Sequence, residues 1–310
     1  MKNITETDQS SEQEPPAIDP PEPSMIAKPM TNLVAALGYE NRRVEWGICS
    51  ECGVKYERTV WIRRDRSEIA PGEQCKACAE LAHQAELREE LAAELKDVEK
   101  EQRVLWRGQC GVEGRFNYKS FDNFNGKLQP EAYKALSEWI DGDRECSVTL
   151  ASPDTYGVGK THLVCALANR LITEWRTVRI VKGEYIGKYA CPVYFISEAR
   201  LMSRIRATYN KHNEECESDE DIYQYLGRVG LLIIDDIGKV RPRDPSFLQG
   251  AYYRIIDDRY VNERPIIATT NLSMTDLETH IGGATADRLR EMCGKGNIIT
   301  MAGVSQRRQK

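Results

Sequence analysis

Residues 157–163 read GVGKTHL and follow a short apolar segment. A glycine-rich turn between a strand and a helix lets backbone N–H groups approach phosphate oxygens, while a lysine adds positive charge and a threonine hydroxyl can bind Mg²⁺. This chemistry needs a strand, a tight turn and a helix in that order, which constrains the fold to the α/β class. The candidate phosphate-binding residues are Gly157, Val158, Gly159, Lys160, Thr161 and His162.

A second motif lies further along the chain, where residues 230–238 read GLLIIDDIG. The apolar run predicts a buried strand that carries Asp235 to the carboxyl edge of a parallel sheet, beside the phosphate turn. There the carboxylate of Asp235 and the hydroxyl of Thr161 can hold Mg²⁺. The two motifs in this order predict an ATP site. The alternative is a glycine-rich loop and an ordinary buried strand with no nucleotide site. It is improbable because both patterns would then have to occur by chance in the right order and spacing.

The phosphate turn departs from the usual pattern at its first position, where Asp154 replaces a glycine. A carboxylate close to a triphosphate is electrostatically unfavourable. We expect this side chain to point outward, because the tightest part of the turn is formed by Gly157 and Gly159. The substitution favours ATP binding with weak turnover.

The segments around both motifs alternate between strand and helix patterns, which predicts a parallel sheet flanked by helices. The strand at 265–270 ends in Thr269, Thr270 and Asn271, and its polar end should reach the same sheet edge as Asp235. Asn271 either orients the attacking water or caps a helix that begins near Met274. The expected elements are strands at 147–151, 193–196, 231–234 and 265–270, and helices at 160–171, 198–209 and 247–260 with a short helix ending at 226.

Four of the ten cysteines form two CxxC pairs separated by 22 residues, namely Cys49, Cys52, Cys75 and Cys78. Each pair can place two thiolates on one metal ion, and two pairs complete a closed tetrahedral Zn²⁺ site. A redox dithiol or unrelated buried cysteines are the alternatives. Structural zinc is favoured because both pairs match and neither has a strand–helix redox context.

Basic residues interleaved with Trp61 surround the two cysteine pairs. They are Arg42, Arg43, Arg58, Arg63, Arg64 and Arg66. Such a pattern can bind a nucleic-acid backbone and stack a base, but zinc modules also bind proteins. Both partners remain open at this point.

The termini and linkers complete the domain plan. Residues 1–24 contain six acidic residues and one lysine, which accounts for the formal net charge of −5, and their composition predicts disorder. We assign 1–28 to a disordered acidic, proline-rich tail, 29–78 to the zinc module, 79–112 to a helical linker and 113–310 to the ATPase domain. Residues 79–104 form an amphipathic helix with Leu87, Leu91, Leu95 and Val98 on one face, ended by glycines from Gly108 onward. No apolar run is long enough to span a membrane and no signal peptide is present, so we expect a cytoplasmic protein.

From Arg115 to Arg307 the chain resembles the AAA+ ATPases of the DnaC, DnaI and IstB type, which are bacterial replicative-helicase loaders and transposition helpers. The resemblance implies an AAA+ P-loop core, and the few residues after Arg307 lead us to expect no carboxy-terminal helical lid. A four-cysteine module before this core is similar to some loaders. The matching segments are 120–124 (SFDNF), 157–163, 193–197 (VYFIS), 231–238, 259–260 with 264–272, 287–290 (DRLR) and the closing strand at 299–307.

The resemblance also implies roles for individual residues. Lys160 binds the β- and γ-phosphates, Thr161 and Asp235 hold Mg²⁺, Asp236 polarises water, and Asn271 is the sensor on the adjacent strand. Arg288 matches the arginine finger inserted into a neighbouring subunit's site, and Arg307 matches a second sensor within its own subunit. Without the family pattern, both arginines would be interpreted as solvated salt bridges.

The function implied by the resemblance is ATP-dependent loading of a ring-hexameric replicative helicase onto single-stranded DNA. The zinc module and linker contact the helicase, subunits associate through the ATP site, and arginines on helix 198–209 (Arg200, Arg204 and Arg206) contact DNA. The lengthened connection at 176–190 is expected to form an exposed hairpin. Two alternatives are a transposition helper of the IstB type, and a nonenzymatic zinc adaptor that binds nucleotide without cleaving it.

Overall fold

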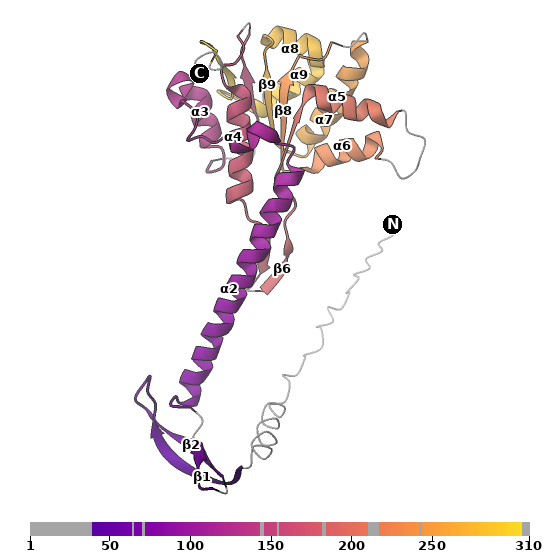
Figure 1. Cartoon of the computed structure of the whole chain (residues 1–310). Helices are drawn as coiled ribbons and strands as arrows, with labels where there is room; N and C mark the ends of the chain where they lie inside the picture. Colours follow the sequence, from indigo (N-terminus) through magenta and orange to yellow (C-terminus); the bar gives the residue numbers. More distant parts are fainter. Residues whose placement is uncertain are drawn as a thin grey trace, which may run out of the picture. The chain divides into compact units, whose positions relative to one another are not determined.

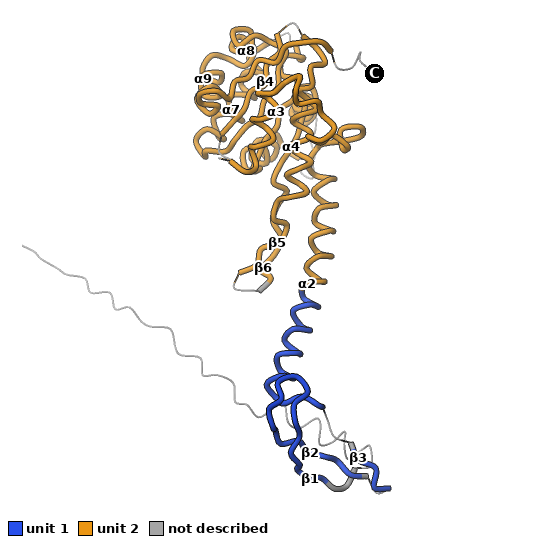
Figure 2. The backbone as a smooth tube through the Cα atoms, turned by 90° about the vertical axis from the view of Figure 1, so that its left-hand side faces the viewer, with its two compact units in different colours: residues 1–91 blue, residues 92–310 orange. Residues whose placement is uncertain are grey.

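The computed structural model describes residues 39–63, 65–69, 72–142, 146–153, 155–181, 184–209, 217–241 and 244–305. The chain forms two compact units, residues 1–91 and 92–310, coloured separately in Figure 2. The boundary between them falls within the segment that the sequence assigns to the linker. Four sequence predictions, those concerning the tail at 1–28, Arg64, Asp154 and Arg307, lie outside the described residues.

The first unit contains a small antiparallel sheet with the order β1-β2-β3, formed by β1 (Tyr39–Ile48), β2 (Lys55–Arg63) and β3 (Glu68–Ile69). Several of its basic residues pair with acidic neighbours. Arg43 binds Glu68 at 2.8 Å and Glu45 at 3.4 Å, and Arg58 binds Glu45 at 2.6 Å. These ion pairs neutralise part of the positive charge of the arginines that are candidates for nucleic-acid binding from the sequence.

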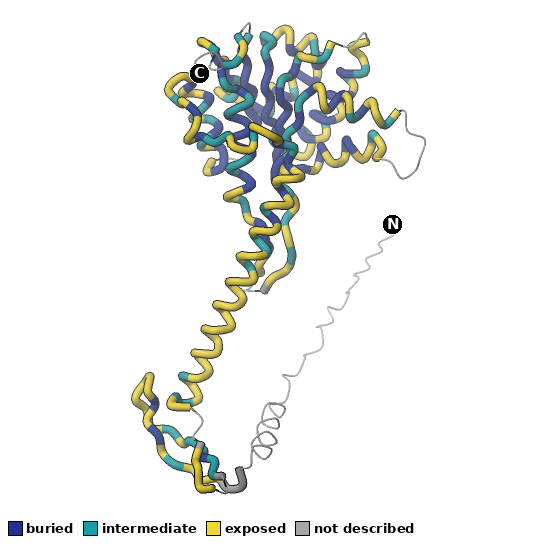
Figure 3. The backbone as a smooth tube through the Cα atoms, viewed as in Figure 1, coloured by how far each residue is buried: buried dark blue, intermediate teal, exposed yellow. Residues whose placement is uncertain are grey.

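The linker helix α2 (Lys76–Gln109) is longer than predicted at both ends. It begins before Ala79, so that Cys78 lies in its first turn, and it continues through Gly108 because one glycine costs only about 1 kcal/mol inside a helix. Trp106 is fully buried in the core of the second unit and favours this extension. The helix stops before Gly111, which adopts a φ of +78° and lies so close to β7 (Val193–Ser197) that a Cβ would meet the Phe195 carbonyl oxygen. Figure 3 shows the amino-terminal half of α2 exposed, including Leu87 and Leu91 of the predicted apolar face.

The second unit contains a five-stranded parallel sheet with the order β10-β4-β9-β8-β7. Its strands are β4 (Val148–Ala151), β7 (Val193–Ser197), β8 (Leu231–Ile237), β9 (Ile266–Thr270) and β10 (Ile298–Thr300). The predicted α/β class is confirmed. The sequence predicts no strand order, and in the structure β9 lies between β4 and β8.

Helices cover both faces of this sheet (Figure 1), which explains its nearly continuous apolar strands. Leu231 and Ile233 of β8 pack toward α3 and α4, while Leu232 and Ile234 pack on the opposite face toward α5, α6, α7, α8 and α9. The helices are α3 (Pro130–Ser137), α4 (Lys160–Glu174), α5 (Glu198–Thr208), α6 (Asp219–Arg228), α7 (Pro245–Val261), α8 (Met274–Ile281) and α9 (Gly283–Cys293), with short 3₁₀ turns η1 (Gly114–Tyr118) and η2 (Gly126–Leu128).

The predicted hairpin at 176–190 is confirmed. It consists of β5 (Val178–Val181) and β6 (Glu184–Lys188), paired antiparallel in a separate two-stranded sheet. The Gln102 side chain donates a hydrogen bond to the Tyr189 carbonyl at 3.0 Å, which fastens the base of the hairpin to α2 within the second unit.

A buried arginine joins the strand and helix ends at the edge of the sheet opposite the phosphate turn. Arg259 on α7 is fully buried, and its guanidinium donates to carbonyl oxygens around the end of α6 and the start of β9. A planar guanidinium group can donate to several acceptors at once. The acceptors are the carbonyls of Leu226, Gly227, Val229, Gly230 and Pro265.

Among the described residues, no helix is both long and apolar enough to cross a membrane.

Candidate nucleotide and metal sites

The phosphate turn joins β4 to α4 and has the backbone that its glycines permit. Gly157 and Gly159 adopt φ values of +78° and +107°, and Gly159 is the N-cap residue that directly precedes α4. These left-handed conformations favour glycine because they would strain a residue with a Cβ. The first N–H groups of α4 remain without helical partners, so this end of the helix suits an anion.

The His162 side chain packs against residues 120–124. Its Nε2 lies 3.1 Å from the Ser120 carbonyl oxygen, and its ring packs edge-on against Phe124 at 5.1 Å. Burial lowers the pKa of His162, which favours a neutral imidazole. The structure therefore places His162 against segment 120–124, whereas the sequence groups it with the nucleotide-binding residues.

The Lys160 ammonium is buried and is held by two side chains at the carboxyl edge of the sheet. Its Nζ donates to Asn271 Oδ1 at 2.7 Å and also contacts Ser152 Oγ. The pairing of β4 with β9 brings these residues together, because Ser152 N–H donates to the Thr270 carbonyl at 3.0 Å. Sequence reasoning missed Ser152, although it is the first polar residue after β4.

Asn271 does not cap α8. Ser273 occupies the cap position, and its hydroxyl accepts a hydrogen bond from Asp276 N–H at 3.1 Å. The capping alternative for Asn271 is therefore wrong. Its side-chain oxygen instead faces Lys160 and Ser152.

Asp235 and Thr161 meet at the same edge, as the sequence predicts. The Thr161 hydroxyl donates toward both carboxylate oxygens of Asp235, at 3.1 and 3.0 Å. Thr269 on β9 also donates to Asp235 Oδ1, at 2.7 Å. Hydroxyl and carboxylate oxygens are hard ligands of the kind that Mg²⁺ prefers, so these residues fit a magnesium site.

Burial gives Asp235 an unusual acidity. The pKa of its carboxyl is raised to about 6, first by removal from water and then by the nearby charge of Asp236, while hydrogen bonds from Thr269 and Thr161 oppose the increase. The protein without metal therefore destabilises the charged form of this group. A bound cation would offset that cost.

Asp236 adopts a left-handed backbone with φ of +60°. Its N–H donates to the Thr269 hydroxyl at 2.9 Å, and its carboxylate pairs with Lys239. Left-handed conformations in residues other than glycine are uncommon and cluster at functional sites. Thr269 thus bonds to both successive aspartates of β8.

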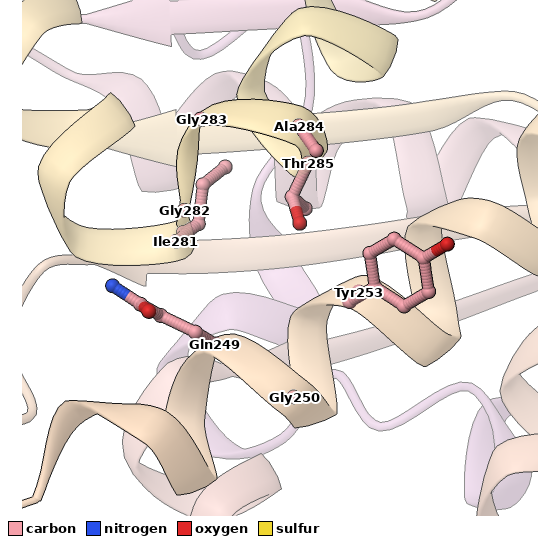
Figure 4. A pocket seen from close by; sticks show the side chains of 8 residues that line it. All are labelled: Gln249, Gly250, Tyr253, Ile281, Gly282, Gly283, Ala284 and Thr285. Carbon is pink, nitrogen blue, oxygen red and sulfur yellow. The ribbon is translucent and has the colours of Figure 1, made fainter.

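Arg288 lies on α9, where it binds residues of its own chain. Its Nε is 3.0 Å from Asp257 Oδ1, and its guanidinium lies over the ring of Tyr253 at 5.0 Å. A groove of about 320 Å³ adjoins Tyr253, with Gln249 and Gly250 of α7 on one side and residues 281–285 on the other (Figure 4). The structure thus places Arg288 on the helical surface formed by α7 and α9.

The three arginines expected to face DNA also have partners within the chain. Arg200 binds Glu113 at 2.7 Å, Arg204 pairs with Glu217, and Arg206 lies over the Phe247 ring at 5.1 Å. A nucleic-acid phosphate would have to replace the two acidic partners.

The four cysteines of the first unit converge as predicted. Their Sγ atoms all lie within 4.8 Å of one another, and those of Cys52 and Cys75 are 3.7 Å apart. Tetrahedral zinc with Zn–S bonds of about 2.3 Å places sulfurs about 3.8 Å apart, so the residues fit this ion. Backbone N–H groups of Cys52 and Cys75 lower the pKa of Cys49 to about 6, whereas hydrogen bonding to Cys52 and Cys75 raises the pKa of Cys78.

The raised pKa of Asp235 predicts a pH-dependent stability. The carboxyl of Asp235 has a pKa of 3.8 in the unfolded chain and of about 6 in the folded protein. Between these two pH values the unfolded chain has already lost the proton that the folded protein still holds, so the folding stability of the wild type decreases as pH rises. Asp235→Asn removes the loss, and at pH 7 without Mg²⁺ it should unfold with a free energy up to about 3 kcal/mol higher than wild type. Urea unfolding at several pH values measures the difference. Asp287→Asn, at an exposed side chain, is the control, and a stability difference between Asp235→Asn and wild type that does not change with pH would contradict the prediction.

Comparison with known proteins adds the family. Residues 118–310 match the family described as IstB-like ATP binding protein. The replicative helicase loader DnaC of Buchnera aphidicola subsp. Baizongia pistaciae is 27% identical over 215 residues, which cover 68% of this chain and 75% of the relative. The DnaC of Escherichia coli K12 is 27% identical over 177 residues, which cover 55% of this chain and 62% of the relative.

A crystal structure of the DnaC helicase loader aligns with 61% of this chain and 98% of its own, with 20% identity and a TM-score of 0.46. The family match covers well over half of the chain and includes the phosphate turn, Asp235 and Asn271. The chain therefore belongs to the IstB-like ATP-binding protein family, among the AAA+ ATPases of the DnaC and IstB type.

Proposed function

We propose that this protein is an ATP-dependent loader that places a ring-shaped replicative helicase on single-stranded DNA. The observation that carries the proposal is the convergence of Lys160, Thr161, Asp235 and Asn271 at one edge of a parallel sheet. The relatives named as replicative helicase loaders support the choice of this function within the family.

ATP binding begins with an exchange of partners at Lys160. The ammonium leaves Ser152 and Asn271 for the β- and γ-phosphates, which the N–H groups of the phosphate turn also bind. Thr161 and Asp235 hold Mg²⁺, which supplies positive charge to the phosphate oxygens when it is bound. The exchange frees the amide of Asn271 to orient water.

Hydrolysis requires a carboxylate that polarises the attacking water, and positive charges from more than one subunit that stabilise the transferred phosphoryl group. Asp236 polarises the attacking water after its carboxylate separates from Lys239. Arg288 leaves Asp257 and stabilises charge on the phosphoryl group of a neighbouring subunit, while Arg307 contacts the γ-phosphate of its own subunit. Subunits therefore associate through the ATP site.

The zinc module at 29–78 and the linker at 79–112 contact the helicase. Zinc held by the four cysteines keeps a unit with a small core folded. Single-stranded DNA binds Arg200, Arg204 and Arg206, and its phosphates replace Glu113 and Glu217. A transposition helper is the second candidate, because the matching family is named for IstB.

Capture of partners by the intact protein in ATP and Mg²⁺ separates the two candidates. A replicative helicase should be captured and a transposase should not, because the two relatives described above are named replicative helicase loaders. Lys160→Ala should still capture the helicase through the first unit but should fail to transfer it to single-stranded DNA, since transfer needs ATP. Lys127→Ala, at an exposed residue of η2, serves as the control and should transfer normally. Capture of transposase alone would overturn the loader function.

Zinc content tests the four-cysteine site. The purified protein should contain about one zinc ion per chain by elemental analysis, because four thiolates complete its coordination. Cys49→Ser with Cys75→Ser should lose the metal and unfold the small sheet. Cys146→Ser with Cys191→Ser, at cysteines outside the cluster, should keep it. A metal-free wild type with residues 39–69 still folded would disprove the assignment.

A further inference from the structure

A buried carboxylate lies next to the candidate site without any role in the steps above. Glu198 is the first residue of α5, directly after β7, and its side chain is completely buried. An unpaired buried carboxylate would be very costly, so its partners show what the charge is used for.

Both oxygens of Glu198 are fully occupied. Oε2 accepts hydrogen bonds from the N–H groups of Gly238 at 3.0 Å and Val240 at 2.7 Å. Oε1 accepts from the Tyr252 hydroxyl at 2.9 Å and lies 2.6 Å from His280 Nε2. Burial raises the pKa of Glu198, but the His280 hydrogen bond and the two backbone donors outweigh it and leave the pKa below its ordinary value.

The two backbone donors belong to the loop that follows the aspartates of β8. Gly238 and Val240 flank Lys239, whose ammonium pairs with the Asp236 carboxylate. Gly238 adopts a φ of +100°, and a Cβ on it would meet Leu272 at 2.6 Å, so the loop has little room for another path. Glu198 thus fixes the segment that determines where Lys239 holds Asp236.

The other two partners belong to α7, which carries the binding partners of Arg288, and to α8, which precedes the helix of Arg288. Tyr252 precedes Tyr253 on α7, and Tyr253 stacks on Arg288. His280 is near the end of α8, two residues before Gly282, the N-cap of α9. One carboxylate therefore joins the Asp236 loop to α7 and α8.

We propose that Glu198 is a positioning residue for ATP hydrolysis. This proposal rests on the proposed ATPase function. It holds the loop after β8 in a fixed position relative to α7 and α8, so that the Asp236 carboxylate is correctly placed relative to the bound nucleotide. We expect ATP binding not to depend on it, because the hydrogen-bond partners of Glu198 described above lie in the loop after β8 and on α7 and α8. Its length matters more than its charge, since the side chain must reach two loop N–H groups and two helix side chains at once.

Two variants of the full chain separate length from charge. Glu198→Gln keeps the length, with its oxygen on the loop N–H groups and its amide toward Tyr252 and His280. Glu198→Asp keeps the charge but is one methylene too short to reach both sides. Steady-state ATP hydrolysis with Mg²⁺ and single-stranded DNA is measured for both, together with hydrogen–deuterium exchange of residues 236–241.

Glu198→Asp should lower kcat about 10- to 100-fold with the KM for ATP nearly unchanged, because misplacement of a reacting group by about 1 Å has effects of this size. Exchange at 236–241 should be faster, while exchange in β9 stays the same. Glu198→Gln should retain a kcat within about threefold of wild type, since its reach is intact. Equal kcat in Glu198→Asp and wild type, unchanged loop exchange, or a larger loss in Glu198→Gln than in Glu198→Asp would overturn the proposal. A wild type without hydrolysis would instead refute the proposed ATPase function.

Discussion

The pairing of β9 with both β4 and β8 is the constraint on which the rest of the site depends. Parallel strands end at the same sheet edge, so the polar residues that follow each strand are brought together there. Thr269 bonds to both aspartates of β8, and Asn271 receives Lys160 from the phosphate turn. The central strand therefore adds to the direct hydrogen bonds that Thr161 makes with Asp235.

The same pairing makes the site costly without its ligands. Asp235 is almost fully buried beside Asp236, and its raised pKa shows that the carboxylate is poorly stabilised. Lys160 in contrast has partners that can be exchanged for phosphates. In the proposed function, a nucleotide with its cation would change the partners of both groups, and such differential contacts can shift a protein between states. Arg288 and Asp236 also have partners within the chain, Asp257 and Lys239, from which activation would have to release them.

Much of this arrangement was predictable from local sequence. The glycine turn, the apolar strands and the cysteine pairs each require particular residues at fixed spacing, and the structure confirms the α/β core and the convergence of the cysteines. The position of β9 was not predictable, because strand order depends on packing between distant segments. Ser152 and Glu198 were missed for the same reason. The helix cap at Ser273 and the burial of Trp106 corrected two local interpretations, those of Asn271 and of the end of α2.

The central claim is that each ATP site is completed by a neighbouring subunit, and mixing two variants tests it most directly. Lys160→Ala and Arg288→Ala should each lose at least about 100-fold in ATP hydrolysis, because one disables the nucleotide turn and the other the finger. Arg290→Ala, on the same helix as Arg288, should remain active. A mixture of the first two variants should recover activity, since the Arg288→Ala subunit offers an intact turn and the Lys160→Ala subunit supplies the arginine. No recovery from two folded variants, or full activity in Arg288→Ala alone, would contradict a shared site.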